Sequence, residues 1–267
     1  MPYVDAFFDR DSDIIRVVER KDGKRHYHEY QSKYTFYYED PRGKYKSIYG
    51  NTLSRIVCKN TKDFRKELAI NKGKNLFESD INPIFQCLSE NYINQDAPKL
   101  NVAFWDIETD FDPERGFAPV EDPFMPITAI TVHLQWLDLL ITVAMPPKGL
   151  PLEEASEICK ERWGDTCILF PNNKQGEGQM LETFLELIED ADIHSGWNSE
   201  GYDVPYTINR IQRVLSKDDT RRFCLWGQLP KRREYEKFGK MSETYDTIGR
   251  VHMDYLNLYR KYTYEER

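Results

Sequence analysis

The sequence lacks the features of a secreted, membrane-spanning or zinc-binding protein. Its five cysteines are odd in number and scattered, and none forms a Cys-x-x-Cys pair or has a nearby histidine partner. This usage indicates a reducing compartment and no zinc site. Residues 1–5 show neither the basic nor the apolar region of a signal peptide, and the apolar stretch 134–145 is too short to span a bilayer. We therefore expect a cytoplasmic protein without a membrane partner.

An excess of positive charge is also absent. The net charge is -8 at pH 7, which argues against a protein that coats nucleic acid nonspecifically, although a local basic groove can coexist with an acidic whole. With 40% hydrophobic and 31% charged residues, the composition is that of a folded protein. A length of 267 residues suits two modest domains or one large one.

The first third of the chain reads as a β-rich domain. Short runs of β-forming residues at 3–8, 14–20 and 26–30 predict an antiparallel meander, and Asp22-Gly23 is a strong hairpin signal. The basic residues around that turn fit either a solvated tip or a phosphate-contacting loop. Two further strands are predicted at 47–50 and 53–57, and a helix at 61–69 with Thr61 as its N-cap.

A polar, proline-containing stretch at 94–99 marks the expected domain boundary. The domains are therefore predicted to cover residues 1–99 and 100–267. In the second domain the sequence predicts the following elements. Strands are expected at 127–134, 139–145, 166–170 and 192–197, helices at 152–163 and 179–190, and a loop at 172–179. This order favours a mixed α/β (α+β) layered domain with a mixed sheet.

An acidic pair lies in the first apolar run of the second domain, Val102-Ala103-Phe104-Trp105-Asp106-Ile107-Glu108-Thr109. In a strand, Asp106 and Glu108 share one face with Phe104, whereas Trp105 and Ile107 point to the other. Two acids so close repel each other and resist burial, so a bound hard cation such as Mg²⁺ or Mn²⁺ is the simplest way to keep both ionised. We therefore predict a metal site.

A third acid, Asp203, lies between a predicted strand and a predicted helix. Its segment reads Trp197-Asn198-Ser199-Glu200-Gly201-Tyr202-Asp203-Val204-Pro205-Tyr206. Helical spacing resumes after Asp203, and Pro205 lies in the first turn. Asp203 alone would fit an ordinary N-cap.

Together, these two segments resemble the first and second exonuclease motifs of family B DNA polymerases, and the similarity spans nearly the whole chain. Segments 48–50 and 254–259 most resemble the replicative polymerases of T-even-type bacteriophages. The resemblance implies a β-rich N-terminal domain followed by a ribonuclease-H-like 3′→5′ proofreading exonuclease, which acts on single-stranded DNA or a primer 3′ end in the host cytoplasm.

The resemblance also implies roles for individual residues. Asp106 would bridge two divalent ions, Glu108 would bind the ion that activates water, and Asp203 would act through the second ion. Asn198 matches the family's motif asparagine and would contact the terminal nucleotide. Phe104 and Trp105 are expected to pack in the core.

Residues 231–250 occupy the place of a β-hairpin that in this family helps to move the primer end between sites. Lys231, Arg232 and Arg233 are therefore candidate DNA-binding residues at a basic, aromatic-bearing hairpin. A solvated loop of mixed charge is the alternative. His194 and His252 have no metal-ligand spacing and are expected to be structural.

The third exonuclease motif of the family, Tyr-x-x-x-Asp, occurs here only at Tyr92 and Asp96, ahead of the first motif and so in the wrong order. The polymerase palm motifs are absent too. We therefore expect weak or no nuclease activity from this chain alone, as an excised part of a longer polymerase or one piece of a split gene.

Two other functions remain open. The chain could be a non-catalytic nucleic-acid-binding or scaffold subunit that a C-terminal polymerase chain completes. It could also be a free-standing nuclease, but Asp246 and Asp254, the acids available to complete the site, do not match the third motif. RNA binding by the N-terminal domain is a further possibility under the resemblance.

Overall fold

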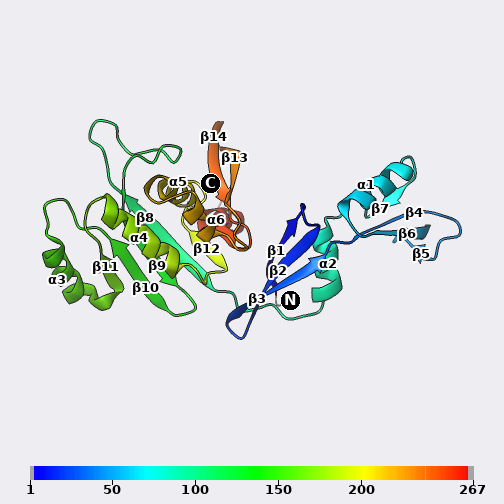
Figure 1. Cartoon of the computed structure of the whole chain (residues 1–267), viewed down its shortest axis with the longest axis horizontal. Coiled ribbons are helices and arrows are strands. Elements are labelled where there is room, and N and C mark those ends of the chain that lie inside the picture. The colour runs from blue at the N-terminus through cyan, green and yellow to red at the C-terminus, as the bar shows by residue number, and fades with distance from the viewer. Residues whose placement is uncertain (1–2, 238, 264–267) are drawn as a thin grey trace. The chain divides into compact units, whose positions relative to one another are not determined.

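The computed structural model describes residues 3–237 and 239–263. The chain forms two compact units that meet at the Lys99–Leu100 peptide bond, and each unit has its own sheets and core (Figure 1). No helix in the described ranges is long and apolar enough to cross a membrane.

The first unit contains two antiparallel sheets and two helices. Its elements are β1 (Tyr3–Asp9), β2 (Ile14–Lys21), β3 (Lys24–Gln31), β4 (Tyr34–Glu39), β5 (Tyr45–Lys46), β6 (Thr52–Cys58), α1 (Thr61–Ile70), β7 (Leu76–Phe77) and α2 (Pro83–Tyr92). One sheet has the order β1-β2-β3 and the other β5-β6-β4-β7. The predicted meander is confirmed, and its hairpin turns at Asp22 (φ 52°) and Gly23 (φ 74°), the conformation that matches strand twist.

Two local predictions for this unit were wrong, and one helix was missed. Residues 47–50 form a turn instead of a strand, because the Ser47 hydroxyl accepts the backbone N–H groups of Tyr49 and Asn51. Asn60, rather than Thr61, caps α1 by accepting the Asp63 N–H at 2.7 Å. Helix α2 was not predicted, although Asn82 before Pro83 is a strong helix-start signal.

The second unit is built on one mixed sheet. Its elements are β8 (Val102–Thr109), β9 (Ile127–Leu134), β10 (Leu139–Ala144), α3 (Leu152–Trp163), β11 (Cys167–Leu169), α4 (Lys174–Leu187), β12 (Ile193–Gly196), α5 (Asp203–Val214), β13 (Lys231–Lys237), β14 (Lys240–Asp246), β15 (Val251–Asp254) and α6 (Tyr255–Tyr262), with short 3₁₀ helices at Gly164–Thr166 and Asp218–Phe223.

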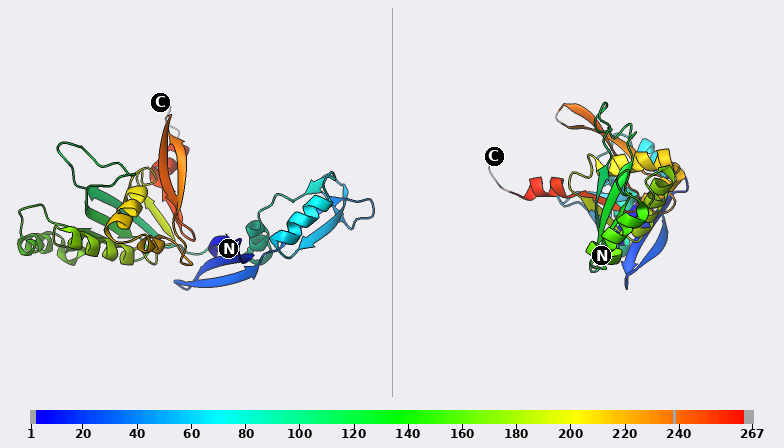
Figure 2. Two further views of the ribbon diagram at one scale, coloured as in Figure 1. Left: turned by 45° about the horizontal axis from the view of Figure 1, so that its top comes forward. Right: turned by 90° about the vertical axis from the view of Figure 1, so that its left-hand side faces the viewer.

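The sheet order is β11-β10-β9-β8-β12-β15, so the acidic strand β8 is central. β8, β12 and β15 run parallel, and β9 runs antiparallel to both β8 and β10. This mixed α/β arrangement has the strand pattern of a ribonuclease-H-like domain, as predicted. The hairpin β13–β14 (orange) projects from the sheet (Figure 2).

Helix α4 begins at Lys174, within the segment predicted as a loop. Two glycines in its first turns made that segment read as irregular. Gly176 is needed because a side chain there would come within 1.9 Å of the Pro171 carbonyl oxygen, so close packing selects the glycine in spite of its poor helix propensity.

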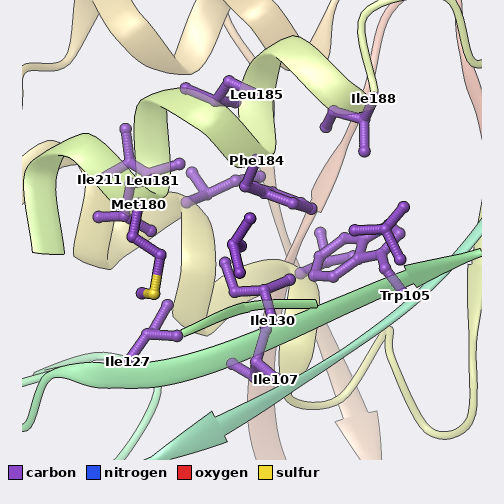
Figure 3. Close-up of a cluster of buried hydrophobic side chains, with 14 of the residues drawn as sticks. Trp105, Ile107, Ile127, Ile130, Met180, Leu181, Phe184, Leu185, Ile188 and Ile211 are labelled. Atoms are coloured by element: carbon purple, nitrogen blue, oxygen red, sulfur yellow. The ribbon is translucent and has the colours of Figure 1, made fainter. Parts of the chain in front are cut away.

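The core of this unit lies between the sheet and helices α4 and α5 (Figure 3). Trp105 and Ile107 of β8 point into it, and the Trp105 ring lies 5.1 Å from that of Phe184 on α4, measured between centroids. The predicted burial of Trp105 and the predicted alternation of side chains along β8 are both confirmed.

A buried ion pair joins α5 to α4. Arg210 donates from Nε and Nη2 to the two carboxylate oxygens of Glu177, each at 2.7 Å, and the side chains are only 10% and 2% exposed. Glu177 also accepts the Ile127 N–H at the start of β9 (3.0 Å), and Arg210 donates to the Pro123 carbonyl (2.8 Å). One pair therefore fixes two helices and the loop before β9.

We expect Glu177→Gln to lower the free energy of unfolding of the second unit by about 3–5 kcal/mol, because Arg210 would keep a buried charge without its partner. Urea titration followed by tryptophan fluorescence measures this unit selectively, since all five tryptophans lie beyond Lys99.

Arg213→Ala is the matched control for that measurement. Arg213 lies one turn further along α5 and pairs with Asp122, but both side chains are about half exposed, so the loss should stay below about 1 kcal/mol. Equal losses in the two variants would contradict a special role for the buried pair.

Candidate functional site

Strand β8 presents its acids on the face opposite the core. Burial alternates along the strand, so Asp106 and Glu108 are exposed while Trp105 and Ile107 are buried. Phe104 shares the exposed face, with 38% of its surface accessible, and stacks against His133 of β9. The expectation that Phe104 packs in the core was therefore wrong, because strand parity places it beside the acids.

Asp203 approaches the same strand from α5. It is the first residue of the helix and only 4% exposed, and Tyr202 occupies the N-cap position. Its carboxylate accepts the backbone N–H of Ile107 at 3.1 Å. Asp203 thus binds the strand between the two exposed acids, and the N-cap alternative does not describe its side chain.

The pKa of Asp203 is raised by its surroundings. Burial raises the pKa of Asp203 to about 7, and the negative charge of Asp106 adds to the increase, while the Ile107 N–H opposes it. Burial also raises the pKa of Tyr202, whose hydroxyl contacts Thr109 and is affected by the charges of Asp203 and Glu108. The fold therefore brings Asp203 against the backbone of β8 and within electrostatic range of Asp106.

A divalent cation fits the chemistry of these donors. Within 3–237 and 239–263, no group of three or more His, Cys, Asp or Glu side chains is already arranged to hold a metal ion. The carboxylates are nevertheless the oxygen ligands that Mg²⁺ and Mn²⁺ prefer. A cation would also offset the cost of burying the ionised Asp203 carboxylate and its repulsion by Asp106, which together keep the pKa of Asp203 high.

The turn that follows β12 carries Asn198, the predicted nucleotide contact. Asn198 is half-buried and adopts a left-handed conformation with φ 56°. Its N–H donates to Asp254 at 3.1 Å, and its carbonyl accepts the Gly201 N–H at 3.0 Å. The Ser199 carbonyl then accepts the Val204 N–H, so this turn leads directly into the helix that begins at Asp203.

The predicted basic hairpin forms, and its cations are exposed on β13, but two of them are paired with acids. Arg232 contacts Glu243 at 2.6 Å, and Arg233 contacts Glu200 at 2.6 Å and Asp246 at 3.0 Å. Lys231 is exposed at the base of the hairpin. The aromatic of the predicted hairpin tip, Phe238, lies outside the described residues.

Asp254 is an organising residue that sequence reasoning had considered only as a possible metal ligand. It is buried at the end of β15 and accepts three backbone N–H groups, those of Asn198, Glu200 and Leu256. Asp246, the other acid considered, is exposed and paired with Arg233. An Asp that ends a short β-like run just before a helix is an N-cap signal, and this signal could have identified Asp254.

The two histidines behave as structural residues. His252 is half-buried on β15 and lies 2.9 Å from the Ser199 hydroxyl through Nε2, and burial lowers its pKa. His194 is buried on β12 and lies against the ring of Phe223. The His252 contact joins β15 to the turn after β12, and the His194 contact joins β12 to the 3₁₀ helix at Asp218–Phe223.

Comparison with known proteins gives a consistent result. A family model described as DNA polymerase family B, exonuclease domain, matches residues 61–266. The chain is 29% identical over 238 residues to a protein of Enterobacteria phage T4 named DNA-directed DNA polymerase, covering 83% of the chain and 26% of the relative. It is 26% identical over 246 residues to one of the same name from Escherichia phage RB69, covering 85% and 27%. The chain thus spans about a quarter of the length of these relatives.

The raised pKa of Asp203 predicts an unusual pH dependence of stability in metal-free buffer. The folded protein holds this proton more tightly than the unfolded chain, whose Asp has an ordinary pKa of 3.8. The resulting stabilisation is present below about pH 4 and is lost as the pH rises toward 7. Each tenfold difference in proton affinity corresponds to about 1.4 kcal/mol.

Asp203→Asn should remove this loss, so the variant should gain stability relative to the wild type between pH 4 and pH 8. Urea titrations with EDTA at both pH values measure the difference in unfolding free energy. A difference in unfolding free energy between Asp203→Asn and the wild type that is equal at pH 4 and pH 8 would contradict the prediction.

Asp106→Asn should lower the pKa of Asp203, because it removes a nearby negative charge. Carboxyl carbon NMR follows this pKa.

Proposed function

This chain belongs to the family B DNA polymerases through their exonuclease domain, and we propose that it is the part that removes nucleotides from the 3′ end of DNA, weakly or not at all as an isolated chain, with divalent ions held by Asp106, Glu108 and Asp203. The observation that carries the proposal is the approach of Asp203 to the strand of the other two acids, through the Ile107 N–H. This contact supports a site to which carboxylates from β8 and α5, two elements distant in sequence, would contribute together.

Exonuclease domains of this family use divalent metal ions. We propose Mg²⁺ or Mn²⁺ as a pair, which would activate a water molecule and stabilise the departing 3′ oxygen. Asp106 and Glu108 reach the site from an exposed strand face and remain open to solvent and DNA. Asp203 reaches it from a buried position, where its carboxylate is fixed by β8 and its negative charge is unfavourable without a cation.

The substrate in this proposal is single-stranded DNA or a frayed primer end. Phe104 offers an exposed aromatic ring beside the acids. In the same proposal, Asn198 on the turn that leads to Asp203 would contact the terminal nucleotide, and Lys231 would add positive charge on the hairpin.

The relatives are named DNA-directed DNA polymerases, and this chain spans about a quarter of their length. We propose that the DNA end is delivered from a polymerase segment, in the same protein or in a partner chain. Co-purification with a C-terminal polymerase fragment tests this part separately.

Metal binding is the most direct test of the site. Asp106→Asn should weaken Mn²⁺ binding, measured by calorimetry, at least about tenfold, because an oxygen ligand is lost. Asp138→Asn is the matched control, since this acid is fully exposed in the β9–β10 turn and should leave Mn²⁺ binding unchanged.

Hydrolysis is measured on a 5′-labelled single-stranded oligonucleotide with Mn²⁺. The Asp106→Ala variant should lose any metal-dependent release of 3′ nucleotides by more than about 100-fold, because the ions supply several kcal/mol of transition-state stabilisation. Mn²⁺ affinity that survives Asp106→Asn together with hydrolysis that survives Asp106→Ala would exclude the proposed site.

A further inference from the structure

A charged side chain, Arg233, joins the hairpin β13–β14 to the turn at residues 197–201. Arg233 donates from Nη2 to Glu200 Oε1 at 2.6 Å and from Nε to Asp246 Oδ1 at 3.0 Å. Both contacts raise the pKa of Arg233, so the guanidinium stays charged. Its donors therefore already face two carboxylates, one on its own hairpin and one on the turn.

Glu200 holds a second element in addition to the hairpin. Its other carboxylate oxygen accepts from the Asn257 side chain on α6 at 2.8 Å. Its backbone N–H donates to Asp254 at 3.2 Å, and Asp254 also accepts the N–H of Asn198. The turn is thus held from the hairpin side by Arg233 and from the β15–α6 side by Asp254 and Asn257.

The same turn is continuous with the site. The carbonyl of Ser199 accepts the Val204 N–H in the first turn of α5, and Asp203 precedes Val204. A displacement of Glu200 by the hairpin would therefore move the backbone between Asn198 and Asp203, which has few ways to absorb the change because most of its polar groups are already bonded.

We propose that Arg233 is a positioning residue, which acts through Glu200 to couple the hairpin to the turn that carries Asn198 and leads to Asp203. In this role Arg233 binds carboxylates of its own chain and does not contact a DNA phosphate, although the neighbouring basic residues suggest such a contact. This role deepens, and rests on, the proposed function at the site. The coupling itself concerns contacts within the chain and is measured without DNA.

The first experiment measures hydrogen exchange of the Asn198, Glu200 and Gly201 amides by NMR in the full chain. Arg233→Met and Glu200→Gln should each speed exchange about three- to tenfold, and the double variant should be no faster than the single variants. Arg233→Lys should restore part of the protection, because one charged contact remains.

Lys231→Met is the matched control, since it removes one positive charge from the same strand and should leave exchange in the turn unchanged. Thermal unfolding of all variants separates local loosening from global loss, because the midpoint should shift by less than about 3 °C. Unchanged exchange in Arg233→Met would overturn the proposal.

The second experiment measures the salt dependence of single-stranded DNA binding. A phosphate contact predicts that Arg233→Met lowers the slope of log affinity against log salt by about one. A positioning role predicts weaker binding with an unchanged slope, and a reduced slope would overturn the proposal. Absence of DNA binding by the wild type would count against the proposed function but not against the coupling seen in exchange.

Discussion

The exonuclease unit depends on one buried ion pair, between Arg210 of α5 and Glu177 of α4. Two charges removed from water are tolerated only when their remaining donors and acceptors are used, and here the Ile127 N–H and the Pro123 carbonyl use them. The pair therefore fixes α5 against α4 and against the start of β9. Since α5 begins at Asp203 and β9 pairs with β8, the same constraint sets the distance between the two halves of the site.

The acids of the candidate site lie in two opposite environments. Asp106 and Glu108 lie on a solvent-facing strand surface, where ionisation costs little, whereas Asp203 is buried and has a pKa near 7. An acid in that position stores unfavourable electrostatic energy that a divalent cation can release. In the proposed metal site, metal affinity and folding stability are therefore linked at Asp203. A substitution that weakened metal binding there would also remove a destabilising charge from the metal-free protein.

The basic hairpin shows why charge in a sequence is a poor guide to a binding surface. Lys231, Arg232 and Arg233 are consecutive, yet Arg232 faces Glu243 and Arg233 faces Glu200 and Asp246. In an acidic chain with a net charge of -8, acids are available to neutralise a basic run within the fold. Their partners on the turn and on β14 make these arginines connectors between elements.

The sequence by itself determined the alternation of β8, most strands of the mixed domain and the two motifs, because strand parity and local turn signals act over a few residues. The order of those strands in the sheet came from the tertiary structure. The sequence also placed Asp106 and Glu108 on one face of a strand and Asp203 at a helix start. Only the tertiary structure decided that Asp203 is buried against Ile107, that Asp254 holds the Asn198 turn and that Arg233 pairs with Glu200. These contacts join residues 33 to 96 positions apart, and no local pattern encodes such a meeting. Gly176 gives the converse case, since a local signal for a loop was overruled by close packing against Pro171.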